Sequence, residues 1–439
     1  MRYLFSCFFL ILFSFALNAQ SSLLQSGPML GYSEMREVMI WVQTKKAAKV
    51  QIRYWPSAKP ADTLHTNAVL TKMESAFTAK LMADRVEPGN RYDYLVLVDG
   101  KAVKLNYPTT FQTQALWQWR TDPPAFKMAI GSCVYVNENP YDRPGKPYGA
   151  DYQIFQSIHK MRPDAMLWLG DNTYLREVDW NTRSGILKRY THTRSMPEMQ
   201  ALLASTHHYA IWDDHDFGPD NSDRSFIHKQ KTLEAFKLFW PNPSFGLDNS
   251  KGITTAFQFA DIDFFLLDNR YHRAPDDRKS GDRTILGKEQ LEWLIDALTS
   301  SRAPFKMIAI GGQVLNPAAV FENYSNNGYN EEREYILKRI EEEKIKGVVF
   351  LTGDRHHTEM SQYTNAAGNI VTDVTISPLT SGHAFNVTDE NTYRVEGTLV
   401  AKRNFGMLEF SGPRRDRVLT VRTYNSDGEE LWVQTIKAN

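Results

Sequence analysis

Short apolar runs, each followed directly by a polar loop, constrain what this chain can fold into. Four such runs have the length of buried strands: residues 127–130, 165–169, 209–212 and 348–351. Segments with helical patterning lie between several of them: residues 151–160, 222–239, 288–298 and 331–343. Strands that alternate with helices predict an α/β layered sheet, and the loops beyond the carboxyl ends of its strands share one edge.

The loops after the four runs are rich in side chains that can bind metals. They contain Gly131-Ser132-Cys133, Gly170 to Tyr174, Asp213 to Asp216, and Gly353 to His357. Each block alone has an ordinary explanation, as a Gly-Asp turn, a solvated acidic loop or a surface pair of histidines. Adjacent like charges repel unless a positive charge lies among them. Because the pattern recurs at four strand ends, it favours one metal centre over four unrelated turns.

Asp171 is the first candidate, both as a metal ligand and as a catalytic residue, because one carboxylate can bridge two cations about 3.5 to 4 Å apart. Cys133 and Tyr174 add a thiolate and a phenolate, a donor pair that suits a strongly Lewis-acidic or soft ion. Together with Asp171 and His356 they predict a first metal that is iron rather than magnesium. The alternative for Tyr174 is an aromatic ring that only packs.

A second metal would draw on carboxylates. Asp171, Asp214 and Asp354 are its candidate ligands, and Asn221 and Gln313 are further oxygen donors. An all-oxygen shell suits calcium, magnesium or manganese. The alternative for the two amides is structural, because buried amides usually satisfy backbone groups.

Two cations held in this way can acidify a water molecule and direct it at a phosphorus atom, so the pattern predicts a metal-dependent phosphoesterase. His215 is the candidate acid that donates a proton to the leaving oxygen, with a structural role as the alternative. Arg270 or Arg273 could bind the substrate phosphate, although an ion pair with Asp268 explains an arginine there equally well.

The first residues and the charge balance bear on location and partners. Residues 1–19 form an apolar stretch that ends in Ala19, which predicts a signal peptide of the Sec type, with a membrane anchor as the alternative. We therefore expect a periplasmic or secreted protein with no membrane span once the peptide, which includes Cys7, is removed. Cys133 is then the only cysteine, and an intramolecular disulfide is excluded.

With 51 basic and 51 acidic residues, the chain has no positive excess to bind nucleic acid.

Short alternating segments between residues 27 and 118 predict a separate N-terminal domain. Turn residues punctuate these segments at regular intervals, which is typical of an antiparallel β-sandwich. The segment Val86 to Tyr94 resembles the turn and tyrosine of fibronectin type III domains. Residues 117–124 predict a linker that ends in Pro123-Pro124. The catalytic domain is then expected over residues 125–439.

The motif set resembles the alkaline phosphatase D family, the PhoD-like branch of the calcineurin-type metallophosphatases. The motifs are Ser132-Cys133, Gly-Asp-x-x-Tyr at 170–174, Asp-Asp-His-acid at 213–216, Leu-Leu-Asp-x-Arg at 266–270 and Gly-Asp-x-His at 353–356. The resemblance implies an α/β fold, a layered αββα sandwich preceded by a small fibronectin- or Ig-like β-sandwich domain. It also implies hydrolysis of small phosphate monoesters or diesters at alkaline pH.

The resemblance further implies a ligand set. Ferric iron (Fe³⁺) would be bound by Cys133, Asp171, Tyr174 and His356, and calcium (Ca²⁺) would face Asp171 and the carboxylates at 214 and 354. Two features depart from the family pattern. The asparagine that follows the Asp-Asp-His block stands at an altered spacing, at Asn221, and Arg2 alone precedes the apolar stretch, where many relatives have a twin-arginine signal.

Two other functions fit the same residues. The first is a phospholipase D-like phosphodiesterase that acts on lipid or polymer diesters. The second is a secreted binding protein that keeps the scaffold without turnover. Intact candidates at every ligand block argue against the second, because a protein without catalysis is expected to have lost some of them.

Overall fold

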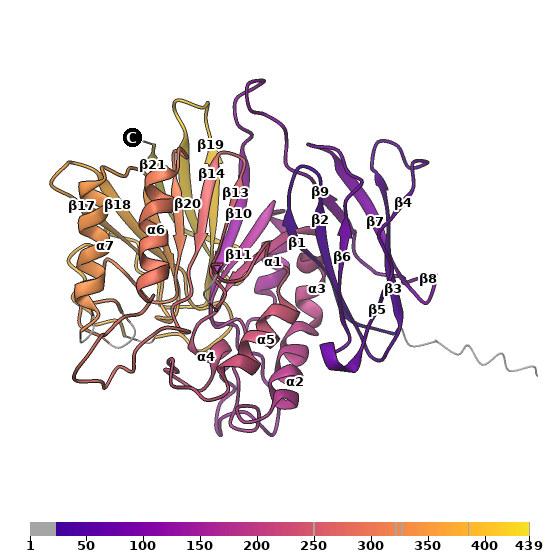
Figure 1. The fold of residues 1–439 in the computed structure, drawn as a ribbon, viewed down its shortest axis with the longest axis horizontal. Coiled ribbons are helices and arrows are strands. Elements are labelled where there is room, and N and C mark those ends of the chain that lie inside the picture. Colours follow the sequence, from indigo (N-terminus) through magenta and orange to yellow (C-terminus); the bar gives the residue numbers. More distant parts are fainter. Residues whose placement is uncertain (1–22, 249–250, 321–322, 326–327, 385, 439) are drawn as a thin grey trace, which may run out of the picture.

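The computed structural model describes residues 23–248, 251–320, 323–325, 328–384 and 386–438. The expected signal peptide lies outside these residues. Two large sheets stack face to face, and helices cover their outer faces (Figure 1). This arrangement confirms the predicted layered α/β fold with a β-sandwich domain before it.

The first sheet has nine strands. In spatial order they are β21 (Glu430–Lys437), β20 (Val418–Asn425), β19 (Asn404–Ser411), β10 (Phe126–Gly131), β11 (Ala165–Leu169), β12 (His207–Ile211), β1 (Leu24–Ser33), β2 (Val38–Thr44) and β6 (Thr78–Ala83). Strands β10, β11 and β12 are parallel neighbours, so the loops that follow them leave the sheet at one edge.

The second sheet has six strands. In spatial order they are β13 (Thr255–Phe259), β14 (Ile262–Leu266), β15 (Lys306–Ala309), β16 (Val348–Thr352), β18 (Ile370–Thr375) and β17 (Glu359–Thr364). Strands β14, β15, β16 and β18 are parallel. Buried side chains of both sheets, such as Leu167 in β11 and Leu351 in β16, belong to one apolar core between them.

Amphipathic helices close the outer faces. Helices α6 (Lys288–Ser300) and α7 (Asn330–Glu342) pack on the six-stranded sheet through a second apolar core that includes Leu294, Ile336 and Phe350. The nine-stranded sheet is covered by α1 (Ile154–Lys160), α2 (Arg183–Arg194), α3 (Pro197–Ser205) and α5 (Lys229–Phe239). The predicted helix at 222–239 begins only at Lys229, because residues 218–228 form the loop and turns after the short helix α4 (Asp214–Phe217).

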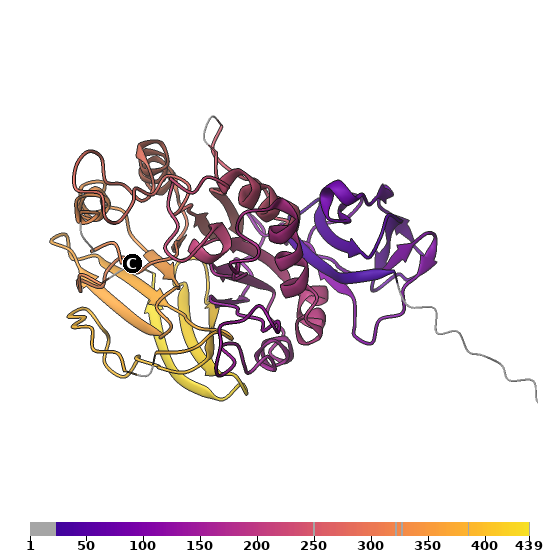
Figure 2. The same cartoon turned by 90° about the horizontal axis from the view of Figure 1, so that it is seen from below.

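The N-terminal domain lies at one end of the molecule (Figure 2). Its separate sheet contains β3 (Lys49–Pro56), β4 (Leu64–His65), β5 (Val69–Leu70), β7 (Arg91–Val98), β8 (Lys101–Ala102) and β9 (Thr110–Gln112). This sheet packs on β1, β2 and β6 through an apolar core of its own, which includes Ile40, Ile52 and Val96.

The second layer of the β-sandwich is part of the nine-stranded sheet. Strand β1 pairs in parallel with β12, with Leu30 opposite His207. Two buried side chains add hydrogen bonds across the same junction: Tyr94 donates to the carbonyl of Ala204 at 2.8 Å, and Trp41 donates to the carbonyl of Leu238 at 2.9 Å. The N-terminal domain is therefore joined to the α/β layers by backbone pairing as well as by the linker.

Candidate metal centre

Polar loops from both sheets meet at the carboxyl ends of the parallel strands. Their side chains form three groups in which the potential ligand atoms all lie within 4.8 Å of one another. The groups are Cys133, Asp171 and His356; Asp171, Asp214 and His215; and Asp213, Asp214 and Asp354. Asp171 belongs to the first two groups and Asp214 to the last two, so the three groups form one continuous cluster.

Five of the predicted ligands have an unusual backbone conformation. Cys133, Asp171, Asn221, Asp354 and His356 all have positive φ angles, between 52° and 65°. Residues other than glycine rarely adopt this left-handed region. Those that do are concentrated at functional sites, where the surrounding structure enforces the conformation. The loops therefore hold these five side chains at positions that an ordinary turn would not give them.

Glycines let the loops approach one another closely. A side chain at Gly311 would place its Cβ 2.0 Å from the Oδ2 atom of Asp213. A side chain at Gly353 would place its Cβ 2.6 Å from the side chain of Ser132. The contact between the loops of the two sheets thus requires glycine at both positions.

Cys133 is fully buried at the base of the cluster. Its Sγ atom lies 3.7 Å from Oδ2 of Asp171 and accepts a hydrogen bond from the Ser377 hydroxyl at 3.2 Å. Burial, with the charge of Asp354 as a further cause, raises the pKa of the thiol to about 12. A thiolate at this position therefore needs a nearby positive charge, which a bound metal ion supplies.

His356 lies between two tyrosines. Its Nε2 atom is 3.2 Å from the Tyr174 hydroxyl, and its Nδ1 atom is 3.2 Å from the Tyr148 hydroxyl. Burial lowers the pKa of His356 to about 4, so its imidazole is neutral at physiological pH, which is the form that binds metals. The hydrogen bond to one ring nitrogen fixes the orientation of the other, as is usual for metal-binding histidines.

The carboxylates of the cluster repel one another. Burial, and then the charge of Asp214, raise the pKa of Asp171 well above its ordinary value. Burial also opposes ionisation of Asp214, but the His215 and Arg270 cations outweigh it and hold the Asp214 pKa below its ordinary value. Among the described residues, the buried Oδ2 atom of Asp354 has no hydrogen-bond partner. Buried carboxylate oxygens without donors fit divalent or trivalent cations, so the residues present are suited to hold metal ions.

Asp213 is a member of the cluster that sequence reasoning did not select. It caps helix α4 and accepts hydrogen bonds from Arg270 and from Asn269, the latter at 2.8 Å. The fully buried Arg270 also lies 3.7 Å from Asp214. Arg270 thus provides a counter-charge inside the acidic cluster. Its ion pair is with Asp213, whereas the sequence suggested an ion pair with Asp268 as one alternative.

The two predicted amide ligands have different positions. Asn221 lies beside Asp214, whose Oδ2 atom accepts a hydrogen bond from the Asn221 backbone at 2.6 Å, and the Asn221 amide oxygen is buried without a partner. Gln313 is occupied elsewhere: its amide nitrogen donates to Glu359 at 2.7 Å, and its amide oxygen accepts from Asn316 at 2.9 Å. The structure therefore brings Asn221 to the cluster and places Gln313 in a neighbouring polar network.

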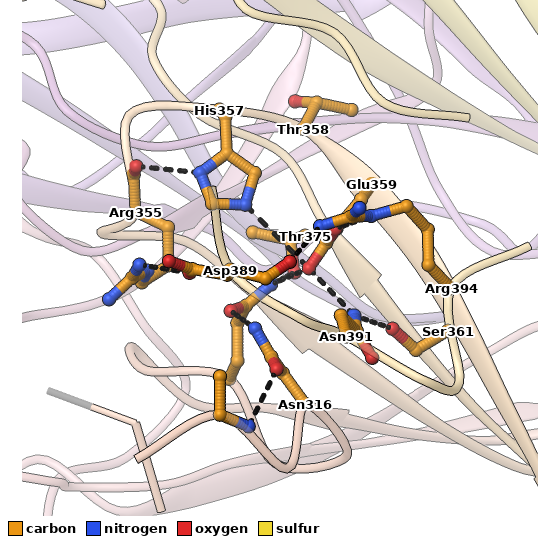
Figure 3. Close-up of polar contacts among 12 residues, drawn as sticks. Asn316, Arg355, His357, Thr358, Glu359, Ser361, Thr375, Asp389, Asn391 and Arg394 are labelled. Atoms are coloured by element: carbon orange, nitrogen blue, oxygen red, sulfur yellow. Dashed lines mark hydrogen bonds and ion pairs between the residues drawn. The ribbon is translucent and has the colours of Figure 1, made fainter. Parts of the chain in front are cut away.

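That network supports the loop that carries His356 (Figure 3). Its centre is the fully buried Glu359, which accepts hydrogen bonds from Arg394 and Asn391 and lies 3.6 Å from Nε2 of His357. Burial opposes ionisation of Glu359, but its interactions with His357 and then with Arg394 outweigh burial and hold its pKa at about 2. Arg355 and Glu359, on either side of His356 and His357, thus both contact the segment around residue 390.

His215 lies at the mouth of the cluster. Its ring contacts the ring of Tyr174, with 4.1 Å between centroids and 31° between the planes, and its Nε2 atom is 3.3 Å from Asp220. The neighbouring Asp216 is turned away from it and accepts from the backbone of Asn172 and Asp213. The acidic partner of His215 is therefore Asp220.

Arg273 is placed apart from these residues. Its guanidinium pairs with Asp276 at 2.9 Å and lies over the ring of Tyr329, with 4.7 Å to the centroid. Its side chain is almost fully buried. These contacts explain Arg273 as a structural residue of the loop after β14.

A cavity of about 740 Å³ opens above the cluster. Asp171, His215, Asp354 and His356 form part of its lining, so the cluster is accessible to a small molecule. Tyr148 also lines this cavity, and nothing in its sequence context marks it as a site residue.

Within the described part of the chain, no helix has the length and apolar content needed to cross a membrane.

Comparisons with known proteins agree with this geometry. Residues 129–414 match the sequence model of the PhoD-like phosphatase family. Residues 21–116 match a domain of unknown function, DUF7800. Alkaline phosphatase D of Bacillus subtilis (strain 168) is 23% identical over 342 residues, which are 65% of this chain and 54% of that protein. The match therefore spans about half the length of this curated relative.

Two solved structures share the fold over nearly the whole chain. A structure of PhoD superposes with a TM-score of 0.76 at 18% identity and covers 95% of this chain and 93% of its own. The purple acid phosphatase PPD1 from yellow lupin (Lupinus luteus) seeds gives a TM-score of 0.68 at 12% identity, over 94% of this chain and 74% of its own. At these identities the two structures establish the fold alone, and the chemistry is inferred from the residues of the site.

Proposed function

The chain belongs to the PhoD-like phosphatase family, and on that premise we propose that it is a metal-dependent phosphoesterase that hydrolyses phosphate monoesters, phosphate diesters or both. One observation carries the proposal. Asp171 shares one group of candidate ligands with Cys133 and His356 and a second group with Asp214 and His215. A carboxylate in that position can hold two cations at once.

We further propose the identity of the metals. Cys133, Tyr174, His356 and Asp171 would hold Fe³⁺, because a thiolate and a phenolate favour a strongly Lewis-acidic ion. Asp171 would share a second ion, Ca²⁺ or else Mg²⁺ or Mn²⁺, with Asp214, Asp354 and Asn221. When bound, the two cations supply Lewis acidity, which acidifies water and neutralises charge on the phosphate.

The protein's own residues complete the site. His215 lines the cavity, and in this proposal it donates a proton to the leaving oxygen. Asp220 and the ring of Tyr174 orient its imidazole. Arg270 stabilises the negative charge of Asp213 and Asp214 from the buried side, so in this proposal it supports the ligands rather than the substrate.

We also propose that the protein is exported to the periplasm or beyond. The apolar stretch over residues 1–19 supports this proposal, and the lone cysteine of the mature chain is compatible with an oxidising compartment. No described residue favours a lipid diester over a small diester.

Rates and metal content measured on one preparation test the function. We expect hydrolysis of 4-nitrophenyl phosphate or bis(4-nitrophenyl) phosphate that is lost with a chelator and restored by added metal. His215→Gln is expected to lower kcat about 100-fold or more, in line with the loss of a general acid. His65→Gln, a change of an exposed histidine in the N-terminal domain, serves as the control. Metal-loaded, folded protein that hydrolyses neither ester contradicts the proposal.

A further inference from the structure

Two exposed cations line the cavity without a partner of opposite charge among the residues that the structure describes. Arg143 and Lys146 lie on the segment between β10 and α1, and both form part of the cavity wall. Across the described residues, neither side chain is in an ion pair. Their charges are therefore available to a bound molecule.

The other two arginines of the cavity wall are already paired. Arg355 forms an ion pair with Asp389 at 2.6 Å. Arg403 forms one with Asp151 at 3.1 Å and donates to the carbonyl of Tyr148. These contacts hold both guanidinium groups in the wall, so the excess positive charge is concentrated at Arg143 and Lys146.

The acidic residues of the same segment do not neutralise this charge. Glu138 lies 2.8 Å from the buried Arg189, and Asp142 lies 3.1 Å from the buried Arg176. Both carboxylates are thus committed to arginines inside the protein. The third acidic residue of the segment, Asp151, pairs with Arg403, so among the described residues none of the three carboxylates pairs with Arg143 or Lys146.

Tyr148 connects the basic segment to the metal centre. The guanidinium of Arg143 lies over its ring, 5.3 Å from the centroid, and its hydroxyl is 3.2 Å from Nδ1 of His356. Gly382 makes room for this ring, because a Cβ at that position would lie 2.6 Å from it. Arg143 is therefore separated from a candidate metal ligand by the width of one aromatic ring.

We propose that Arg143 and Lys146 form a subsite for a second anionic group on the leaving-group side of the substrate, so that the enzyme prefers esters that carry another phosphate or phosphodiester. This inference rests on the proposed phosphoesterase function. The phosphate that reacts occupies the cluster end of the cavity, and the second anion reaches the two cations. A substrate with one phosphate leaves both cations in water and gains nothing from them.

A matched pair of substrates isolates the second anion. Butane-1,4-diol bisphosphate and butane-1,4-diol monophosphate share the leaving chain and differ only in the second phosphate. Because the bisphosphate carries two reactive phosphates, kcat/KM is counted per phosphate; on that basis we expect the wild-type value to be about 10-fold higher for the bisphosphate, mainly through a lower KM, because each exposed ion pair contributes a few-fold. The preference should shrink in 0.5 M NaCl, which screens exposed charges.

Variants locate the subsite. Arg143→Ala and Lys146→Ala should each reduce the bisphosphate preference about 3-fold, and the double variant should abolish it while monophosphate hydrolysis is kept. Arg36→Ala and Lys101→Ala, which remove exposed cations of the N-terminal domain, should leave the ratio unchanged. A wild-type ratio near one, or an unchanged ratio in the double variant, overturns the subsite and leaves the phosphoesterase function intact. Failure to hydrolyse either compound overturns both.

Discussion

Replacing Asp171 by asparagine should have opposite effects on the metal-free and the metal-loaded protein. In the metal-free protein the Asp171 carboxylate is buried within 4.8 Å of the ligand atoms of Asp214 and Cys133. Two unit charges at that distance repel by about 3.5 kcal/mol at an effective dielectric constant of 20. Protonation of Asp171 relieves part of this repulsion, so we expect asparagine to stabilise the metal-free protein by about 1 to 3 kcal/mol at pH 8.

The sign of the pH dependence follows from the raised pKa of Asp171, whose first cause is burial. A carboxyl group with a raised folded-state pKa takes up a proton on folding, and the stability that it gives is lost as the pH rises. Asp171→Asn removes that loss. The variant should therefore gain little over wild type near pH 4 and progressively more towards pH 8.

Thermal unfolding in the presence of a chelator, followed by fluorescence between pH 4 and pH 8, measures this effect. A gain of this size should raise the unfolding midpoint by a few degrees. The same variant should lose hydrolysis by a factor of about 1,000 or more and bind fewer metal ions, because the bridging charge is gone. A variant that is less stable than wild type without metal, yet keeps its metal content and rate, refutes the reasoning.

Three further changes test other parts of the site. Cys133→Ser should lower bound iron, as measured by elemental analysis, because a hydroxyl is a poorer ligand than a thiolate for this ion; unchanged iron would exclude Cys133 as a ligand. Tyr148→Phe removes the hydrogen bond to Nδ1 of His356 and should weaken metal affinity about 10-fold in a competition titration, whereas equal affinity would separate Tyr148 from the metal centre. Burial raises the pKa of Asp373 from 3.8 to about 6, so its contribution is present below pH 3.8 and lost towards pH 6, about 3 kcal/mol in all. Asp373→Asn should flatten the fall of the unfolding midpoint over that range, and an unaltered slope would contradict the raised pKa.

The strand ends could be read from the sequence because their signal is local. An apolar run followed by Gly-Asp or Asp-Asp-His marks both a buried strand and the polar loop after it, and parallel strands bring such loops to one edge. Asp171, Asp214 and His356 were found in this way. Asn221 also lies beside the cluster, seven residues after Asp214.

Other residues carry no such local signal. Tyr148 reaches the cluster from a loop rich in proline and glycine, and only the fold places it opposite His356. Asp213 and Asp214 are adjacent in sequence, and it is the cap of helix α4 that turns Asp213 towards Arg270. Gln313 follows β15, whose carboxyl end lies at the same edge, but its amide is hydrogen-bonded to Glu359 and Asn316 in another network.

The domain division shows the same limit. Alternating segments indicate a β-sandwich, but alternation does not reveal which strand lies at the border of the sheet. The parallel pairing of β1 with β12, between residues 177 positions apart, depends on the tertiary structure alone.

The metal content of the purified protein tests the central claim most directly. Elemental analysis after reconstitution should find two metal ions per wild-type chain and fewer in Asp171→Asn, with both proteins folded by circular dichroism. A folded wild-type protein that retains no metal ion would contradict the two-metal centre and the chemistry proposed from it.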